Sequence, residues 1–416
     1  MAASVGAGNR VTHAPHQDRN PGGLRSTACR EHSDDGEMSE PLRVETDHNV
    51  YILGAGFSVE AGIPAVAGFL DALRDSLGWL ESQPRREAEA TAVRNVLEFR
   101  RLAAAASDRV KMNVDDIEEL FSLASATPGD EYANYVTTAI AATIDYCRSG
   151  QPRLSYQIDT GYADSEPPPP RKLGAARSRR VNTNSVIWDD YEYYAAAIAG
   201  MLTTPSKNGR NTVITFNYDT VLEEGLEMLG VPVNYNVSVS SRQGALRILK
   251  LHGSVNWINS GFSESSLDTI KEVGRYADVL AAGERAMLLP PTWRKQFGGG
   301  LSRIWDASVN AISEATRLIV IGFSLPATDS HFKYLLAAGL RDNIALRKIV
   351  FVNPVATTEL KPRLEAVLRA ELFERGLIVL RDKTARAFFT SRSDVALIGR
   401  PFPAGLSGDP TSSRIR

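Results

Sequence analysis

The sequence predicts an α/β fold in which helices cover both faces of a parallel sheet. The first observation is a series of short runs rich in Val, Ile and Leu, which are typical of strands buried on both faces. The second is that segments with helical periodicity separate many of these runs. The third is that glycine or polar residues follow directly after several runs, at the edge of the sheet where ligands bind in such folds. Together they indicate a Rossmann-like sheet.

Several apolar runs are candidate strands, and helices are expected between the later ones. The candidate strands are Val50–Leu53, Thr212–Phe216, Arg247–Leu251, Ala286–Leu289, Arg317–Ile321, Lys348–Val352 and Leu377–Leu380. The expected helices are Val221–Leu229, Arg303–Ala315, Ser330–Leu340 and Thr358–Arg375. Alternation of strands and helices favours units in which consecutive strands run parallel.

The interval between the first and second candidate strands is too long for a simple crossover. We therefore expect an inserted helical subdomain at about 66–210. Its expected helices are Phe69–Leu80, Arg86–Ala106, Asp115–Leu123, Tyr132–Cys147 and Val186–Leu202. A flexible loop is expected inside it at about 148–185, where four prolines precede a basic cluster. This cluster is explained either by a solvated linker, which is several times more common, or by contact with an acidic partner or nucleic acid.

The remaining organisation follows from composition. Residues 1–44 have no apolar period and are expected to form a disordered leader, 45–400 a single domain, and 401–416 a flexible tail. The net charge of −2 argues against a nucleic-acid partner, and no apolar run is long enough for a membrane span. The two cysteines, Cys29 and Cys147, cannot build a four-thiolate zinc site, and they favour a reducing, cytoplasmic setting.

The turn after the first strand is the strongest nucleotide signal. Val50–Leu53 leads into Gly54-Ala55-Gly56, and glycines let a backbone approach a pyrophosphate closely. Ser58 adds a hydroxyl, whereas Val59 stands where a dinucleotide fingerprint has its third glycine. A plain strand-to-helix turn explains the same glycines equally well.

Polar residues also follow the next two strands. Asn217 and Asp219 come after Thr212–Phe216, although a turn residue and a helix N-cap are alternative roles for them. His252 follows Arg247–Leu251 and could act as an acid or base near neutral pH, although a lone histidine is more often structural.

Two later strands end in the same manner. Gly322 and Ser324 follow Arg317–Ile321, and Asn353 follows Lys348–Val352. Because the carboxyl ends of parallel strands meet at one edge, a single crevice would collect all of these groups.

The motifs GAGFSVEAGIP, TFNYD, LHGS, GFSLP and VNP, in this order, resemble those of the Sir2 (sirtuin) superfamily. More narrowly, the chain resembles the bacterial Sir2-like NAD-hydrolase branch that acts in antiviral (phage) defence. The resemblance covers roughly residues 48–385. Two further stretches, NVDDIEELFSL and LPPTWRK, are similar to that branch.

The resemblance implies a role for each motif residue. Gly54, Ala55, Gly56 and Ser58 would line the NAD+ pyrophosphate. Asn217 would position the attacking water, Asp219 would support the same ribose, and His252 would be the catalytic base. Ser324 and Asn353 would contact the cofactor on its adenosine side, and Gly322 would also belong to the cofactor-binding residues. Asp329 lies nearby and receives no role.

Two departures from the deacylating sirtuins narrow the expected activity. Ala65-Val66-Ala67 stand where those enzymes have Asp-Phe-Arg, and the zinc cysteines are missing, so no metal is expected. The expected function is that of an NAD+ glycohydrolase releasing nicotinamide and ADP-ribose, with NAD+ as substrate and water as acceptor. The alternatives are a protein deacylase or ADP-ribosyltransferase, and a non-catalytic NAD or ADP-ribose sensor. A homo-oligomer and an activator protein encoded nearby are the expected partners.

Overall fold

The computed structural model describes most of the chain from residue 48 to residue 398. The described residues are 48–127, 130–149, 155–157, 179–180, 186–201, 211–237, 244–259, 270–289, 300–325 and 330–398. All of them belong to one compact unit, Glu45–Arg416. The expected leader at 1–44, the tail at 401–416 and most of the expected loop at 148–185 lie outside the described residues.

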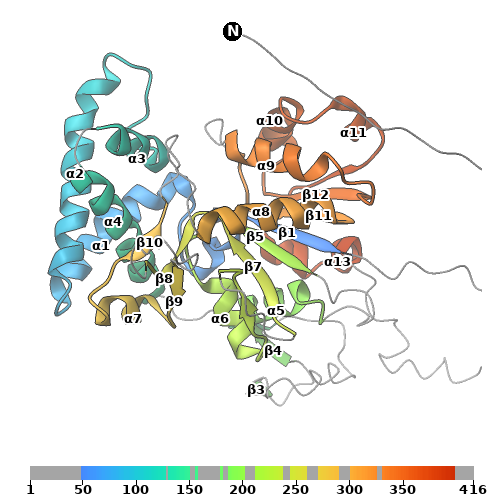
Figure 1. Ribbon diagram of the computed structural model, residues 1–416, viewed down its shortest axis with the longest axis horizontal. Helices are drawn as coiled ribbons and strands as arrows, with labels where there is room; N and C mark the ends of the chain where they lie inside the picture. Colours follow the sequence, from blue (N-terminus) through green and yellow to red (C-terminus); the bar gives the residue numbers. More distant parts are fainter. Residues whose placement is uncertain are drawn as a thin grey trace, which may run out of the picture. The chain divides into compact units, whose positions relative to one another are not determined.

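A seven-stranded, fully parallel sheet forms the centre of the structure (Figure 1). Its strands are β1 (Asn49–Leu53), β5 (Thr212–Thr215), β6 (Val233–Asn234), β7 (Leu246–Lys250), β11 (Arg317–Ile321), β12 (Lys348–Val352) and β13 (Ile378–Arg381). Their order across the sheet is β13-β12-β11-β1-β5-β7-β6. The α/β fold class expected from the sequence is therefore confirmed.

The strand order creates a switch point at β1. From β1 the chain continues outward through β5 to β6 and β7, and then returns to β11 on the other side of β1. All five residues of β1 are buried, as expected for a central strand covered on both faces. In sheets of this kind, the crevice outside the carboxyl ends of the strands at the switch point binds ligands. The carboxyl ends of β1, β5 and β11 therefore define where a ligand site is expected.

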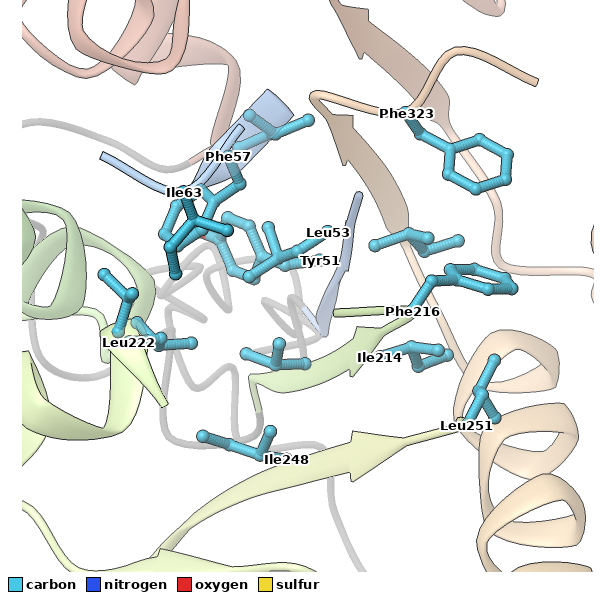
Figure 2. Packing of buried hydrophobic residues seen from close by; sticks show 14 of the residues in the cluster. Tyr51, Leu53, Phe57, Ile63, Ile214, Phe216, Leu222, Ile248, Leu251 and Phe323 are labelled. Atoms are coloured by element: carbon cyan, nitrogen blue, oxygen red, sulfur yellow. The ribbon is translucent and has the colours of Figure 1, made fainter. Parts of the chain in front are cut away.

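Helices after the strands complete the two outer layers. They are α6 (Val221–Met228), α8 (Gly300–Ser313), α9 (Ser330–Leu340), the π-helical turn η3 (Ala356–Leu360), α10 (Lys361–Glu365), α11 (Ala370–Glu374), α12 (Ala385–Phe389) and α13 (Arg392–Ile398). The single helix expected at Thr358–Arg375 is thus divided, because Arg369 takes up an extended backbone before α11. Figure 2 shows Phe57, Ile63 and Leu222 on one side of β1, and Phe216 and Phe323 on the other.

A small antiparallel sheet follows β7. It consists of β8 (Gly253–Asn259), β9 (Ile270–Glu272) and β10 (Ala286–Leu288), with α7 (Tyr276–Ala281) between the last two. The run Ala286–Leu289 is therefore a strand, as expected, but it does not belong to the parallel sheet. A two-residue turn separates β8 from β7. The strand β10 pairs with β8 in the antiparallel direction.

The described residues between β1 and β5 are mostly helical, as expected from the sequence. It contains α1 (Val66–Ser82), α2 (Glu87–Ser107), α3 (Ile117–Ala126), α4 (Asp130–Ser149) and α5 (Asp190–Ile198). The helices α1 to α4 pack on one another (Figure 1, blue to teal). Three short strands, β2 (Ser155–Gln157), β3 (Arg179–Arg180) and β4 (Val186–Asp189), precede α5. Val186–Asp189 was expected to be helical, but its Val-Ile-Trp run suits a strand. Within the described residues, no helix is both long and apolar enough to cross a membrane.

A buried ion pair ties β7 to α6. The Lys250 side chain is fully buried, and its Nζ lies 2.9 Å from Glu223 Oε1. Lys250 Nζ also donates a hydrogen bond to the carbonyl of Asp219. Burial raises the pKa of the Glu223 carboxyl above its ordinary value, although the Lys250 ammonium beside it acts in the opposite direction. Each charge therefore depends on the other for compensation.

Removal of one partner of this pair should destabilise the folded protein. We expect Lys250→Met to lower the free energy of unfolding by about 3–5 kcal/mol, because Glu223 would stay buried without its counter-charge. Adding Glu223→Gln should restore part of the loss. The control is Arg341→Met, which breaks an exposed pair with Asp342 and should change stability by less than about 0.5 kcal/mol. Urea denaturation measures all of them, and equal effects of Lys250→Met and Arg341→Met would contradict the pairing.

Candidate active site at the carboxyl edge of the sheet

The turn after β1 is held against the end of β11. It consists of two short 3-10 helices, η1 (Ala55–Phe57) and η2 (Val59–Ala61). The Gly54 amide donates to the Ile321 carbonyl at 3.0 Å, and the Gly56 amide donates to the Gly322 carbonyl at 2.8 Å. These bonds extend the β1–β11 pairing beyond the strands and into the turns that follow them.

Three glycines make this contact possible. A Cβ on Gly54 would lie 2.7 Å from the Gly322 oxygen, and one on Gly56 would lie 2.8 Å from the Gly322 Cα. Gly322 itself has a φ of +67°, and a Cβ there would lie 2.3 Å from the Phe57 nitrogen. The glycines are thus required for the approach of two turns, independently of any ligand. The same approach brings the ends of β1 and β11 to one place at the switch point.

Asn217 joins this turn from the end of β5. Its Nδ2 donates to the Gly54 carbonyl at 3.0 Å and to Ser58 Oγ at 3.1 Å. Its backbone amide donates to Thr215 Oγ1 at 3.0 Å. Because the Gly54 carbonyl can only accept, the orientation of the Asn217 carboxamide is fixed. Its Oδ1 has no hydrogen-bond partner within the described part of the chain and remains available as an acceptor.

Ser58, which was expected to line a ligand, has a protein partner in the structure. The residue is fully buried, and its hydroxyl accepts the hydrogen bond from Asn217. The structure brings Ser58 and Asn217 together from positions 159 residues apart in the sequence. Sequence reasoning placed both residues at one edge without predicting that they bond to each other.

The Asp219 side chain forms a hydrogen bond with the first residue of α6. Its Oδ1 accepts from the Val221 amide at 3.1 Å, and its carbonyl accepts from Lys250 Nζ. The N-cap of α6 is Thr220, so the Asp219 side chain closes a turn with the Val221 amide and is not the N-cap that was the alternative for this residue. In this arrangement Asp219 fixes the loop that carries Asn217.

His252 lies in the turn between β7 and β8. It is 5% exposed, and its ring stands edge-on to Phe216, with 5.2 Å between ring centroids. Tyr218 lies 6.0 Å from it on the other loop, and Phe216 in turn contacts Phe323 at 4.9 Å. Figure 2 shows the Phe216 and Phe323 rings next to each other. Aromatic contacts therefore link His252 to the turns after β5 and β11.

Four hydrogen bonds join the segment Thr215–Asp219, which contains the loop after β5, to the segment Lys250–Val255, which contains the turn after β7. The Leu251 amide donates to the Thr215 carbonyl at 3.0 Å, and the Val255 amide donates to the Tyr218 carbonyl at 3.0 Å. Ser254 Oγ donates to the Tyr218 carbonyl at 3.3 Å, and the fourth bond is the one from Lys250 to Asp219. Asn217 and His252, one on each loop, are consequently held in a fixed relation.

The two residues expected on the adenosine side differ in exposure. Ser324 is exposed, and its carbonyl accepts from Arg363 Nη1 at 2.8 Å. Asn353 is 9% exposed and uses both ends of its amide: Nδ2 donates to the Phe323 carbonyl at 3.3 Å, and Oδ1 accepts from the Val355 amide at 3.0 Å. Asn353 thus joins the β12 turn to the β11 turn. Asp329 lies outside the described residues.

Several residues of this edge were not singled out by the sequence. Tyr218 donates its hydroxyl to the Leu289 carbonyl at 2.6 Å, and Lys250 anchors Asp219. The sequence did not indicate a role for Lys250, because a lysine at the end of an apolar run is unusual only if its side chain is known to be buried. In the part of the chain that the structure describes, no group of three or more His, Cys, Asp or Glu residues could hold a metal ion.

The contact of the glycine turns can be tested with a matched pair of substitutions. Gly322 and Gly376 both have a φ of +67°, but a Cβ on Gly376 would meet nothing within 4 Å. Gly376→Ala should cost only the backbone strain, about 1–2 kcal/mol. Gly322→Ala should cost clearly more, because Phe57 or the β11 turn must move. Thermal unfolding measures the difference, and equal losses would contradict the tight contact.

Comparison with known proteins gives one family match. Residues 211–372 match a family described as SIR2-like domain, which covers the sheet from β5 to β12. No curated protein matches the chain. Among solved structures, a Sir2 homologue in complex with NAD is 13% identical over 84% of this chain and 89% of its own, with a TM-score of 0.38. A Sir2 homologue mutant in complex with ADP-ribose is 13% identical over 89% and 95%, with a TM-score of 0.37. These scores are too low to align individual site residues. The family match therefore makes residues 211–372 similar to a SIR2-like domain.

Proposed function

We propose that this chain is an NAD+ glycohydrolase, which hydrolyses the bond between nicotinamide and ribose. The observation that carries the proposal is the fixed Asn217 carboxamide, whose Oδ1 is available at the switch point of a SIR2-like sheet. His252 on the neighbouring loop supplies a group that can accept a proton near neutral pH. Similar solved structures contain NAD or ADP-ribose, which supports NAD+ as the substrate.

The glycine turn has a suitable group for the pyrophosphate. The amides of Gly54 and Gly56 are already engaged with Ile321 and Gly322. The amide of Ala55, between them, has no partner within the described residues, so it can donate to a phosphate oxygen. We infer that the pyrophosphate contacts this turn chiefly through the Ala55 amide.

The chemistry follows from the polar groups at the edge. As the bond to nicotinamide breaks, its electron pair leaves with the ring nitrogen, and positive charge develops on the ribose. Asn217 Oδ1 can accept a hydrogen bond from a water and orient its oxygen toward the anomeric carbon. His252 takes up a proton from a ribose hydroxyl or from the attacking water. The products are neutral nicotinamide and ADP-ribose.

The resemblance of the motif set to the bacterial defence branch extends this proposal. We propose that the enzyme depletes NAD+ as an antiviral effector, assembles as a homo-oligomer, and is triggered by a protein encoded nearby. NAD+ loss in cells that express the chain with its neighbouring genes, and not in cells that express a His252→Ala form, would support this role. Retention of NAD+ in both would count against it.

Nicotinamide release by the purified protein is the direct test. We expect His252→Ala to lower kcat by about 10²–10⁴-fold, as for loss of a general base, with a much smaller change in KM. Asn217→Ala should also lower kcat, because the water would lose its acceptor. The matched control is His331→Ala, on α9 beside Trp305, which should keep its activity.

Product analysis separates the proposed hydrolase from the other sirtuin-like activities. Free ADP-ribose supports hydrolysis, whereas ADP-ribose attached to protein or to an acyl group indicates transfer. Full nicotinamide release by both the His252→Ala and Asn217→Ala variants would overturn the proposal. If the wild-type protein releases none even with its neighbouring gene products, while calorimetry shows NAD+ bound intact, the chain is a sensor.

A further inference from the structure

The glycine turn, residues 54–64, is also tethered on its far side by side chains of α4 and α5. Tyr191 donates its hydroxyl to the Phe57 carbonyl at 2.7 Å. Tyr194 donates its hydroxyl to Glu60 Oε2 at 2.6 Å, and Arg148 Nη1 donates to the Ala61 carbonyl at 3.1 Å. The inserted helices thus hold three residues of the turn on either side of Ser58.

The tyrosine tethers lie in a closely packed aromatic cluster. The Phe57 ring is 5.5 Å from Tyr191 and 6.0 Å from Tyr194, and the two tyrosines are 5.2 Å apart. Tyr194 is fully buried and also stacks on Phe389 at 4.9 Å. On the other side of α5, a Cβ on Gly225 of α6 would lie 2.4 Å from the Tyr191 carbonyl. Since α5 is packed this tightly, a movement of it would have to carry the turn with it.

Arg148 connects the turn to the helix that follows Asn217. Its guanidinium Nη1 donates to Ala61 of the turn, while Nη2 lies 2.5 Å from Glu224 Oε2 on α6. Glu224 also accepts a hydrogen bond from Thr220 Oγ1 at 3.3 Å, at the start of α6. One side chain of α4 therefore contacts both segments that meet at the Ser58–Asn217 hydrogen bond.

These tethers converge on the group that the proposed chemistry needs. Phe57, whose carbonyl Tyr191 holds, is the residue before Ser58. Ser58 Oγ and the Gly54 carbonyl together fix the Asn217 carboxamide. A shift of the turn by about 1 Å would break the 3.1 Å bond from Asn217 to Ser58 and free the carboxamide to rotate, and a misplacement of that size can cost about 10²-fold in rate.

We propose that Tyr191 and Arg148 are positioning residues, through which the inserted helices α4 and α5 control the orientation of Asn217 and hence turnover. This inference rests on the proposed NAD+ hydrolysis and adds its means of control: displacement of α5 shifts the turn with it, breaks the bond from Asn217 to Ser58 and lowers kcat. Both residues act through the turn, Tyr191 on the Phe57 carbonyl and Arg148 on the Ala61 carbonyl.

Tyr191→Phe removes one hydroxyl and keeps the ring that packs on Phe57. We expect its kcat for nicotinamide release to fall about 10-fold or more, with KM changed much less. Arg148→Met, which removes the hydrogen bond to the Ala61 carbonyl, should also lower kcat. The matched control is Tyr146→Phe on α4, whose ring lies 5.7 Å from Trp79, away from the turn, and it should keep its kcat. Thermal unfolding of the three variants checks that each is folded.

A readout that does not depend on turnover completes the test. Amide hydrogen exchange in the peptide covering residues 54–64 should be faster in Tyr191→Phe than in the wild-type protein and in Tyr146→Phe. Faster exchange with lower kcat supports the proposal. Unchanged exchange and kcat in both Tyr191→Phe and Arg148→Met, or an equal loss in Tyr146→Phe, overturns it. If the wild-type protein releases no nicotinamide, the hydrolase proposal fails, while the exchange data still decide whether the tethers hold the turn.

Discussion

The close approach of two glycine turns is the constraint on which the rest of this edge depends. Gly54 and Gly56 on one side and Gly322 on the other leave no room for side chains between the ends of β1 and β11. This contact places the Gly54 carbonyl where Asn217 can bond to it, and it brings Phe323 next to Phe216. Phe216 in turn contacts His252. The residues at the ends of β1, β5, β7 and β11 are therefore positioned by one backbone contact and by the side chains that pack next to it.

Buried polar groups give this edge its rigidity. Lys250, Asp219 and Glu223 link β7 to α6 with little exposure to water, and the loops that carry Asn217 and His252 are cross-linked beside them. Such networks cost desolvation and stabilise only when every member has a partner. Two candidate catalytic groups on separate loops therefore keep one mutual arrangement, as preorganised catalysis requires.

Most of the sheet could be predicted from the sequence, because Val, Ile and Leu runs such as those of β1 and β11 indicate strands buried on both faces. The sheet to which Ala286–Leu288 belongs could not, since pairing depends on contacts distant in the sequence. The glycine and polar residues at the strand ends were predictable as a group. Their partners were not: a serine hydroxyl that accepts from Asn217, or a tyrosine that bonds to Phe57, follows from packing that leaves no local pattern.

Gly225 has a consequence for the modularity of the fold. Because the α5 backbone lies directly on this glycine, the inserted helix α5 and the helix α6 pack against each other without any spacer. A chimera that exchanged the helices between β1 and β5 with those of a distant relative would bring a foreign α5 onto α6. The inserted helices therefore cannot be exchanged without a matching change in α6. Its helices and the residues of α6 that face them are expected to change together, as one inherited unit.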